Sequence, residues 1–249
     1  MSVDITYLRI KRVIGSGEEC FLCVLEDEIE SKFIDTYLSE LVMDASSREK
    51  IIESRGFCNH HFYKMFIAAS KPKSSDGHGM ALIMQSVTEQ IIQDLHRQRN
   101  YHKDAFHVII ANEKKCPACV HLAEFMKIYV KMVVELLSSH HKEFLKLFKE
   151  SKGLCIPHFV TLIHVAEEIA RDRSKDIIET LSEIEEKNLG KLNSELAEYV
   201  RRQSYEFSDK DRAAAEDVVL RGVERIAGRR GIRPVLLQKS QGVLFKVGS

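Results

Sequence analysis

Two stretches of the sequence share one pattern, GFCNHHF at residues 56–62 and GLCIPHF at residues 153–159. A Cys-x2-Cys pair precedes each stretch, CFLC at residues 20–23 and CPAC at residues 116–119. Cys58 follows Cys23 by 35 positions, and Cys155 follows Cys119 by 36. The chain therefore contains an internal duplication of the motif C-x2-C…G-[FL]-C-x2-H-F.

Each copy of this motif offers three thiols and one imidazole at spacings typical of zinc sites. Two residues between paired ligands let one turn of chain point both donors at the same ion, and three thiolates with one imidazole complete a tetrahedral shell. A helix beginning at each pair would stabilise thiolates further through its unpaired N–H groups. Four protein ligands leave no position for water, so the pattern predicts two structural zinc ions per chain. We predict one Cys3His site in each copy, formed by Cys20, Cys23, Cys58 and His61 in the first and by Cys116, Cys119, Cys155 and His158 in the second.

The histidine ligand of the first copy has two candidates. His61 matches His158 in register, because both stand three residues after the third cysteine and directly before a phenylalanine. We therefore favour His61, and His60 stays open as the ligand or as a hydrogen-bond partner of a ligand. Iron–sulfur ligation is disfavoured because each copy has three cysteines rather than four. A di-iron site is disfavoured because the sequence has no Glu-x-x-His motif.

A redox function is the alternative interpretation of the cysteines. The segment from Cys116 to Cys119 resembles dithiol motifs at helix starts, but those motifs belong to βαβ surroundings that this sequence does not show. A thiol sensor that releases zinc when a Cys116–Cys119 disulfide forms stays open.

The composition is that of a globular protein of 249 residues, with 44% hydrophobic and 30% charged residues. The 37 basic residues balance the 37 acidic ones, so the chain has no overall attraction to nucleic acid or to an anionic membrane. A zinc-dependent nucleic-acid-binding regulator remains an alternative because zinc modules often serve that role. The sequence shows no signal peptide and no membrane span, so we expect a reduced, cytoplasmic protein without membrane contact.

Apolar residues recur every three or four positions over most of the chain, which predicts an all-α fold. The pattern is clearest in residues 22–41, 80–95, 120–137 and 159–169. Ser174 is expected to cap a long helical stretch that is one kinked helix or two helices around Gly190. Ser208 is expected to open a last helix that ends at Gly228, and the tail around residues 240–242 could form a small β-hairpin.

The duplication also suggests a division of the chain. We expect a first Cys3His helical unit over residues 1–100 and a second over residues 101–173. Residues 174–228 would form helices that pack on both units, and residues 229–249 would form a tail. Each metal would pin the start of a long helix to the start of a later one, which would couple folding to metal binding.

From Cys20 to Gly228 the motifs resemble an uncharacterised bacterial and archaeal family, a domain of unknown function with duplicated Cys-x2-Cys and Cys-x2-His motifs. The segments DGHGMALI at residues 76–83 and RRQSYEF at residues 201–207 take part in this resemblance. The resemblance implies a mostly helical prokaryotic protein and no particular activity.

No catalytic signature accompanies the metal motifs. The sequence lacks G-x-S-x-G, H-E-x-x-H and a phosphate-binding loop, so we predict no catalytic residue and no organic cofactor. The leading hypothesis is a zinc-stabilised helical scaffold that presents a surface to an unknown protein partner. An enzyme with its substrate in a pocket between helices stays open.

Overall fold

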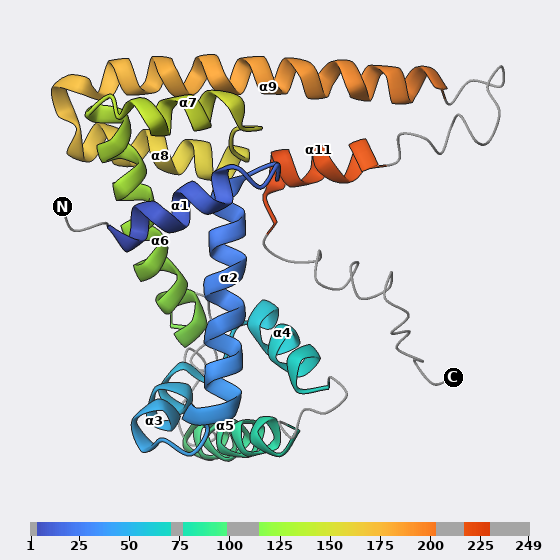
Figure 1. The fold of residues 1–249 in the computed structure, drawn as a ribbon. Helices are drawn as coiled ribbons and strands as arrows, with labels where there is room; N and C mark the ends of the chain where they lie inside the picture. Colours follow the sequence, from blue (N-terminus) through green and yellow to red (C-terminus); the bar gives the residue numbers. More distant parts are fainter. Residues whose placement is uncertain (1–3, 71–76, 99–114, 203–216, 230–249) are drawn as a thin grey trace. The chain divides into compact units, whose positions relative to one another are not determined.

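The computed structural model describes residues 4–70, 77–98, 115–202 and 217–229, and the regular structure in these ranges is helical (Figure 1). Since the described residues contain no β-strand, the predicted all-α class is confirmed. The hairpin expected around residues 240–242 lies outside the described residues. Within the described parts of the chain, no helix combines the length and the apolar character needed to cross a membrane.

The chain divides into two compact units. The first consists of residues 1–27 and 126–233, and the second of residues 28–125 and 234–249. The boundaries at residues 27 and 125 fall inside helices α2 (Phe21–Thr36) and α6 (Pro117–Ser138). The expected boundaries at residues 100 and 173, with one unit per sequence copy, therefore do not coincide with the observed units.

The first unit contains α1 (Ile5–Ile14), α7 (Lys142–Glu150), α8 (Ile156–Ile169), the 3-10 turn η3 (Arg171–Arg173), α9 (Ser174–Arg202) and α11 (Asp217–Ala227). Helices α8, α9 and α11 pack against one another, and α1 packs against α7. The core includes Phe21, whose ring meets that of Phe148 edge to face at 5.8 Å, and Phe148 in turn stacks on Phe144 at 5.7 Å. These aromatic contacts hold the beginning of α2 against α7.

The second unit contains the π-helical turn η1 (Tyr37–Leu41), which continues α2, followed by α3 (Ala45–Ser54), α4 (Asn59–Ala69) and α5 (Gly77–Gln98). Helix α5 packs against α3, α4 and η1 (Figure 1). Asp44 is the N-cap of α3, because its side chain accepts a hydrogen bond of 2.7 Å from the backbone N–H of Ser47. The core between these helices contains Phe57, whose ring meets Tyr37 at 5.4 Å and Phe62 at 5.7 Å.

The stretch after Ser174 forms one helix of 29 residues, without a break at Gly190. Ser174 has helical dihedral angles and donates its hydroxyl hydrogen to the carbonyl of Arg171 at 2.7 Å. It is therefore not the N-cap that the sequence predicted, because the turn η3 runs directly into the helix. The expected start at Ser208 lies outside the described residues, and Gly228 ends α11 with φ +77° as predicted.

We expect Gly190→Ala to raise the free energy of unfolding by about 0.5–1 kcal/mol, because alanine loses less backbone entropy in a helix interior. The site is exposed, and a Cβ there would meet nothing within 4 Å. Urea denaturation followed by circular dichroism would measure the change. Gly153→Ala is the matched control: it should destabilise, since φ is +88° and the new Cβ would overlap the Glu185 carboxylate. A destabilising Gly190→Ala would contradict a continuous α9.

Candidate metal centres

The first unit brings together four donor side chains, Cys20, Cys23, Cys155 and His158, which we call cluster A. Their donor atoms all lie within 4.8 Å of one another. The sulfurs of Cys23 and Cys155 are 3.5 Å apart. His158 Nδ1 lies 3.2 Å from the sulfur of Cys155, 3.4 Å from that of Cys23 and 3.5 Å from that of Cys20.

The second unit brings together the other four predicted ligands, Cys58, His61, Cys116 and Cys119, which we call cluster B. The sulfurs of Cys58 and Cys119 are 3.7 Å apart. His61 Nδ1 lies 3.1 Å from the sulfur of Cys58, 3.4 Å from that of Cys119 and 3.5 Å from that of Cys116. His61 thus faces the thiols, as its register indicated.

The prediction that each sequence copy closes its own Cys3His site is wrong. Cluster A joins the Cys-x2-Cys pair of the first copy to the Cys-x2-His pair of the second, and cluster B joins the remaining two pairs. The division of the chain gives the physical reason. Helices α2 and α6 both cross the boundary between the two units, at residues 27 and 125. The start of α2 therefore belongs to the first unit together with α8, and the start of α6 belongs to the second unit together with α4.

All four ligand pairs occupy the same place on a helix, namely the N-cap and the third helical residue. Cys58 and Cys155 are the N-caps of α4 and α8. Cys20 and Cys116 directly precede α2 and α6, and their carbonyls accept the N–H groups four residues later at 3.4 Å and 3.0 Å. Each cluster therefore lies where two helix starts meet, and the unpaired N–H groups and positive helix ends favour thiolates there.

The glycine of the G-[FL]-C segment turns the chain into its ligand helix. Gly56 has φ +95° and Gly153 has φ +88°, a backbone conformation that disfavours any side chain. A Cβ on Gly56 would lie 2.5 Å from the ring of Phe62. The same turn contains a serine in both copies, Ser54 and Ser151, whose hydroxyls donate to backbone carbonyls at 2.8 Å and 2.7 Å. The second part of the repeated motif therefore begins two residues before its glycine, as S-[RK]-G-[FL]-C.

The spacing of the donors matches a tetrahedral zinc shell. Bond lengths of about 2.3 Å to sulfur and 2.0–2.1 Å to nitrogen place the donors about 3.8 Å apart for two sulfurs and about 3.6 Å apart for sulfur and nitrogen. The sulfur pairs measured here are 3.5 and 3.7 Å apart, and the sulfur–nitrogen pairs are 3.1–3.5 Å apart. All six cysteines are free thiols and none is more than 9% exposed. The two clusters could each hold a metal ion.

One thiol in each cluster loses its proton more readily than a free cysteine. Hydrogen bonds from the thiols of Cys20 and Cys23 lower the pKa of Cys155 to about 4, against the opposing effect of burial. At Cys116, burial raises the pKa, but the hydrogen bond from His61 and nearby backbone N–H groups outweigh it and lower the pKa to about 6.

Glu30 fixes the orientation of the cluster B histidine. This buried carboxylate, 1% exposed, lies on α2, and its Oε1 is 3.0 Å from His61 Nε2 and 2.7 Å from His60 Nε2. Lys64 pairs with its other oxygen. Burial raises the pKa of Glu30, but the two histidines and Lys64 outweigh this and hold the pKa well below its usual range. With Nε2 held by Glu30, the ring presents Nδ1 to the thiols.

His60 belongs to this carboxylate network and does not face the thiols. Glu30, His60 and His61 are also close enough together to form a third potential metal group. Because the ammonium of Lys64 already pairs with the carboxylate of Glu30, the arrangement favours a hydrogen-bonded network over another cation. The open choice between the two histidines is thus resolved in space, with His61 at the cluster and His60 behind it.

Arg225 of α11 supports cluster A from a buried position, 1% exposed. It donates hydrogen bonds to the carbonyls of Leu154, at 2.6 Å, and Lys152, which precede Cys155 in the chain. It also pairs with the carboxylates of Glu19, at 3.2 Å, and Glu185, at 3.5 Å. Arg225 therefore links both segments that lead into the cluster A ligands.

Two other groups complete the surroundings of cluster A. Burial raises the pKa of Glu185 to about 7, an effect that the charge of Arg225 partly offsets, and Glu185 accepts the N–H of Leu154 at 2.6 Å. The backbone at Gly228 passes so close that a Cβ there would lie 3.5 Å from the sulfur of Cys155 and 3.9 Å from that of Cys23. The end of α11 thus covers the thiols of cluster A.

The sequence motifs did not include these supporting residues, namely Glu19, Glu30, Glu185 and Arg225. Glu30 had a local signal, because it stands seven residues after Cys23 and therefore on the same face of the helix. Arg225 had none, since its partners lie 40 to 206 positions away in the sequence.

The described chain is therefore an all-α protein with two buried Cys3His clusters. It belongs to a family of unknown function, DUF6062, which matches residues 1–231. Comparison with curated proteins and with solved structures gave no significant match. The expectation of an uncharacterised family is thereby confirmed.

We expect Arg225→Met to lower the free energy of unfolding by about 3–5 kcal/mol, because buried Glu185 would lose its cation and the carbonyls of Leu154 and Lys152 would lose their donor. Arg201→Met is the matched control: its ion pair with Glu198 on α9 is largely exposed and should contribute no more than about 1 kcal/mol. Chemical denaturation of the three proteins would measure both changes. Equal losses for the two variants would show that the buried network does not support the fold.

Proposed function

We propose that the protein is a helical scaffold that binds two structural zinc ions, one in each Cys3His cluster. The observation that carries the proposal is the geometry of the eight donors, which stand in two groups at the spacings of tetrahedral zinc shells. Two additional features support it. Each donor pair is held at a helix start, and each histidine has a carboxylate near its far nitrogen, Glu30 at 3.0 Å from His61 and Glu26 at 3.7 Å from His158.

A structural role suits the clusters better than a catalytic or sensing role. Three thiols and one imidazole fill the tetrahedral shell, so the metal has no position left for water or substrate. Reactive and redox-sensing cysteines are usually solvent-accessible, whereas all six thiols here are buried. Free, closely spaced thiols also fit a reducing compartment such as the cytoplasm, which we include in the proposal.

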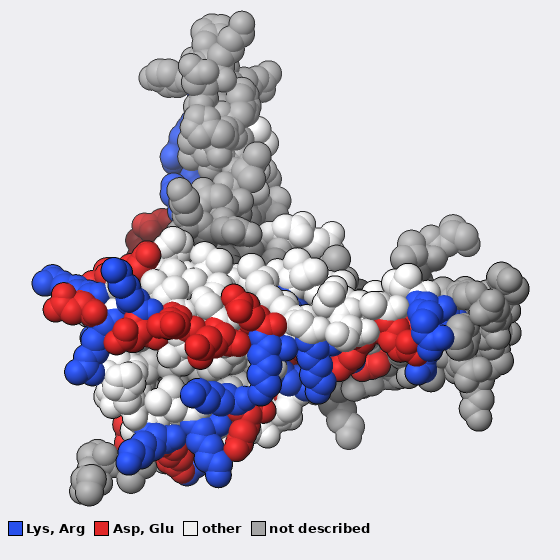
Figure 2. Space-filling model, turned by 90° about the horizontal axis from the view of Figure 1, so that it is seen from above, with Lys and Arg blue, Asp and Glu red and all other residues white. Residues whose placement is uncertain are grey.

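The surface supports a protein partner over nucleic acid. Figure 2 shows basic and acidic side chains interleaved on the face it draws, without the basic stripe that nucleic acid requires. Helix α11 exposes Val219, Val223 and Ile226, which recur at helical spacing, while two of its charged residues, Glu224 and Arg225, are buried. An apolar stripe that faces outward is typical of interaction sites.

We expect protein purified without oxygen to contain two zinc ions per chain, and metal removal by a strong chelator to unfold it, since metal binding energy is folding energy in such sites. Elemental analysis and circular dichroism before and after chelation would measure both effects. Protein that holds less than one metal ion per chain, or that keeps its helical signal after complete removal, would contradict the proposal.

Double substitutions test which ligands belong to the same metal site. Cys20→Ser with Cys155→Ser removes two ligands of cluster A, so the chain should retain one zinc ion. Cys20→Ser with Cys58→Ser removes one ligand from each cluster, so both ions should bind weakly or be lost. Zinc content after gel filtration would distinguish the two variants. If each sequence copy formed its own site, the second variant would retain one ion and the first would lose both.

A further inference from the structure

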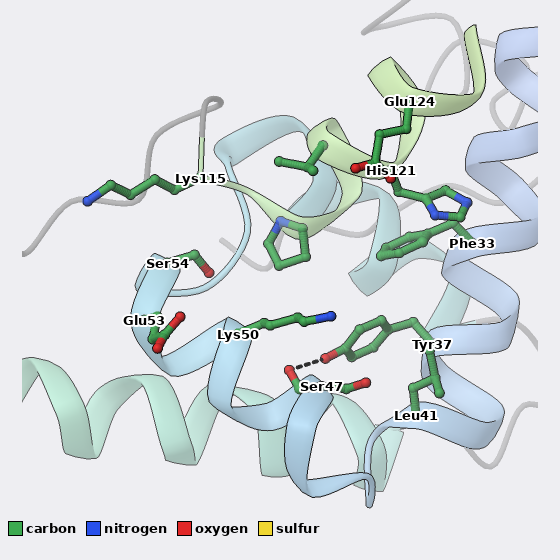
Figure 3. Close-up of a pocket in the computed structure, with 12 residues that line it drawn as sticks. Phe33, Tyr37, Leu41, Ser47, Lys50, Glu53, Ser54, Lys115, His121 and Glu124 are labelled. Carbon is green, nitrogen blue, oxygen red and sulfur yellow. Dashed lines mark hydrogen bonds between the residues drawn. The ribbon is translucent and has the colours of Figure 1, made fainter. Parts of the chain in front are cut away.

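A cavity of about 610 Å³ opens in the second unit, and none of the residues that line it is a cluster B ligand (Figure 3). Helix α3 forms one side, the end of α2 with η1 forms the back, and the first two turns of α6 form the other side. Its volume lies within the range of sites for small organic ligands. Neither the metal clusters nor the scaffold function uses it.

The back of the cavity is aromatic. The ring of Phe33 lies 4.8 Å from that of His121 and 5.5 Å from that of Tyr37, and the side chains of Pro117 and Val120 also line the cavity. The imidazole of His121 contributes its face to this wall, and among the described residues neither of its nitrogens has a hydrogen-bond partner. The rings of Phe33, Tyr37 and His121 therefore form a wall that suits contact with a planar aromatic ring.

One positive charge reaches this aromatic wall. In Figure 3 the side chain of Lys50 extends across the cavity toward the ring of Tyr37. Hydrogen bonds from Ser47 and the charge of Lys50 contribute to lowering the pKa of the Asp44 carboxylate, but within the described residues no carboxylate lies at ion-pair distance from the Lys50 ammonium group. The neighbouring hydroxyls are already used, since Tyr37 donates to the carbonyl of Ser47 at 2.8 Å and Ser54 donates to that of Gly56 at 2.8 Å. Lys115 also lines the cavity, but Figure 3 shows its side chain directed away from the aromatic wall. Lys50 is therefore the charged donor that this wall offers to a ligand.

The charge balance limits what can bind. The carboxylates of Glu53 and Glu124 also line the cavity and are exposed, so a ligand with several negative charges would be repelled. We propose that this cavity binds a small planar aromatic monoanion, such as an aromatic carboxylate. The ring lies against Phe33, Tyr37 and His121, and the anionic group accepts hydrogen bonds from Lys50.

Titration of the metal-loaded full chain with 1-naphthoate tests the proposal, with neutral 1-naphthalenemethanol as the comparison ligand. The chain has no tryptophan, so naphthalene fluorescence can be followed directly. We expect saturable binding of naphthoate at one site per chain and weaker binding of the alcohol. Lys50→Gln should weaken naphthoate binding about tenfold or more and leave binding of the alcohol unchanged, because a hydrogen bond to a charged group is lost.

Further variants separate this cavity from nonspecific binding. Val120→Tyr places a large ring on the cavity wall at an exposed position without adding a tryptophan and should abolish naphthoate binding. Lys127→Gln, at an exposed lysine on α6 that does not line the cavity, and Met84→Lys, in a separate apolar groove between α4 and α5, should bind as the wild type does. Circular dichroism checks that each variant folds. The proposal is overturned if naphthoate does not bind, if Lys50→Gln binds it equally well, or if only Met84→Lys loses binding.

Discussion

The architecture depends on one constraint, the meeting of helix starts in pairs around buried sulfur and nitrogen donors. Cluster A joins the starts of α2 and α8, and cluster B joins those of α4 and α6. Helix starts expose unpaired N–H groups and partial positive charge, which would repel one another if they met around apolar side chains. Thiolates supply the opposite charge, so the same four residues satisfy the helix ends and form a donor set for a metal.

Buried charges next to the clusters extend this arrangement. Arg225 links the segments before Cys20 and Cys155, and Glu30 holds the far side of the His61 ring. An isolated buried charge costs several kcal/mol, but each of these is paired and hydrogen-bonded. Such networks add little net stability to a fold, yet they restrict the ligand side chains to one geometry. The ligand side chains are thus positioned by hydrogen bonds and ion pairs from neighbouring residues as well as by the helices that carry them.

The sequence alone predicted the helical class and all eight donors, because a duplicated motif and a 3.6-residue period are local signals. It did not predict which pairs meet. The distance between the ligand pairs is nearly the same in both copies, so the sequence spacing alone does not decide which pairs meet; that depends on how the helices pack within each unit. The role of Arg225 could not be predicted for a related reason, since its contacts join residues far apart in the chain. The cavity near Lys50 likewise depends on how three helices pack, which periodicity does not specify.

The crossed ligand pairs also set an order of events during synthesis. In the sequence, the two ligand pairs of cluster B are separated by 55 to 61 positions, whereas those of cluster A are separated by 132 to 138 positions. The cluster A pairs stand before and after the cluster B pairs in the chain. A chain that emerges from the ribosome with its N-terminus first completes cluster B once Cys119 has been made, while Cys20 and Cys23 still await their partners. In that interval the nascent chain contains an unpaired dithiol as well as a completed donor set.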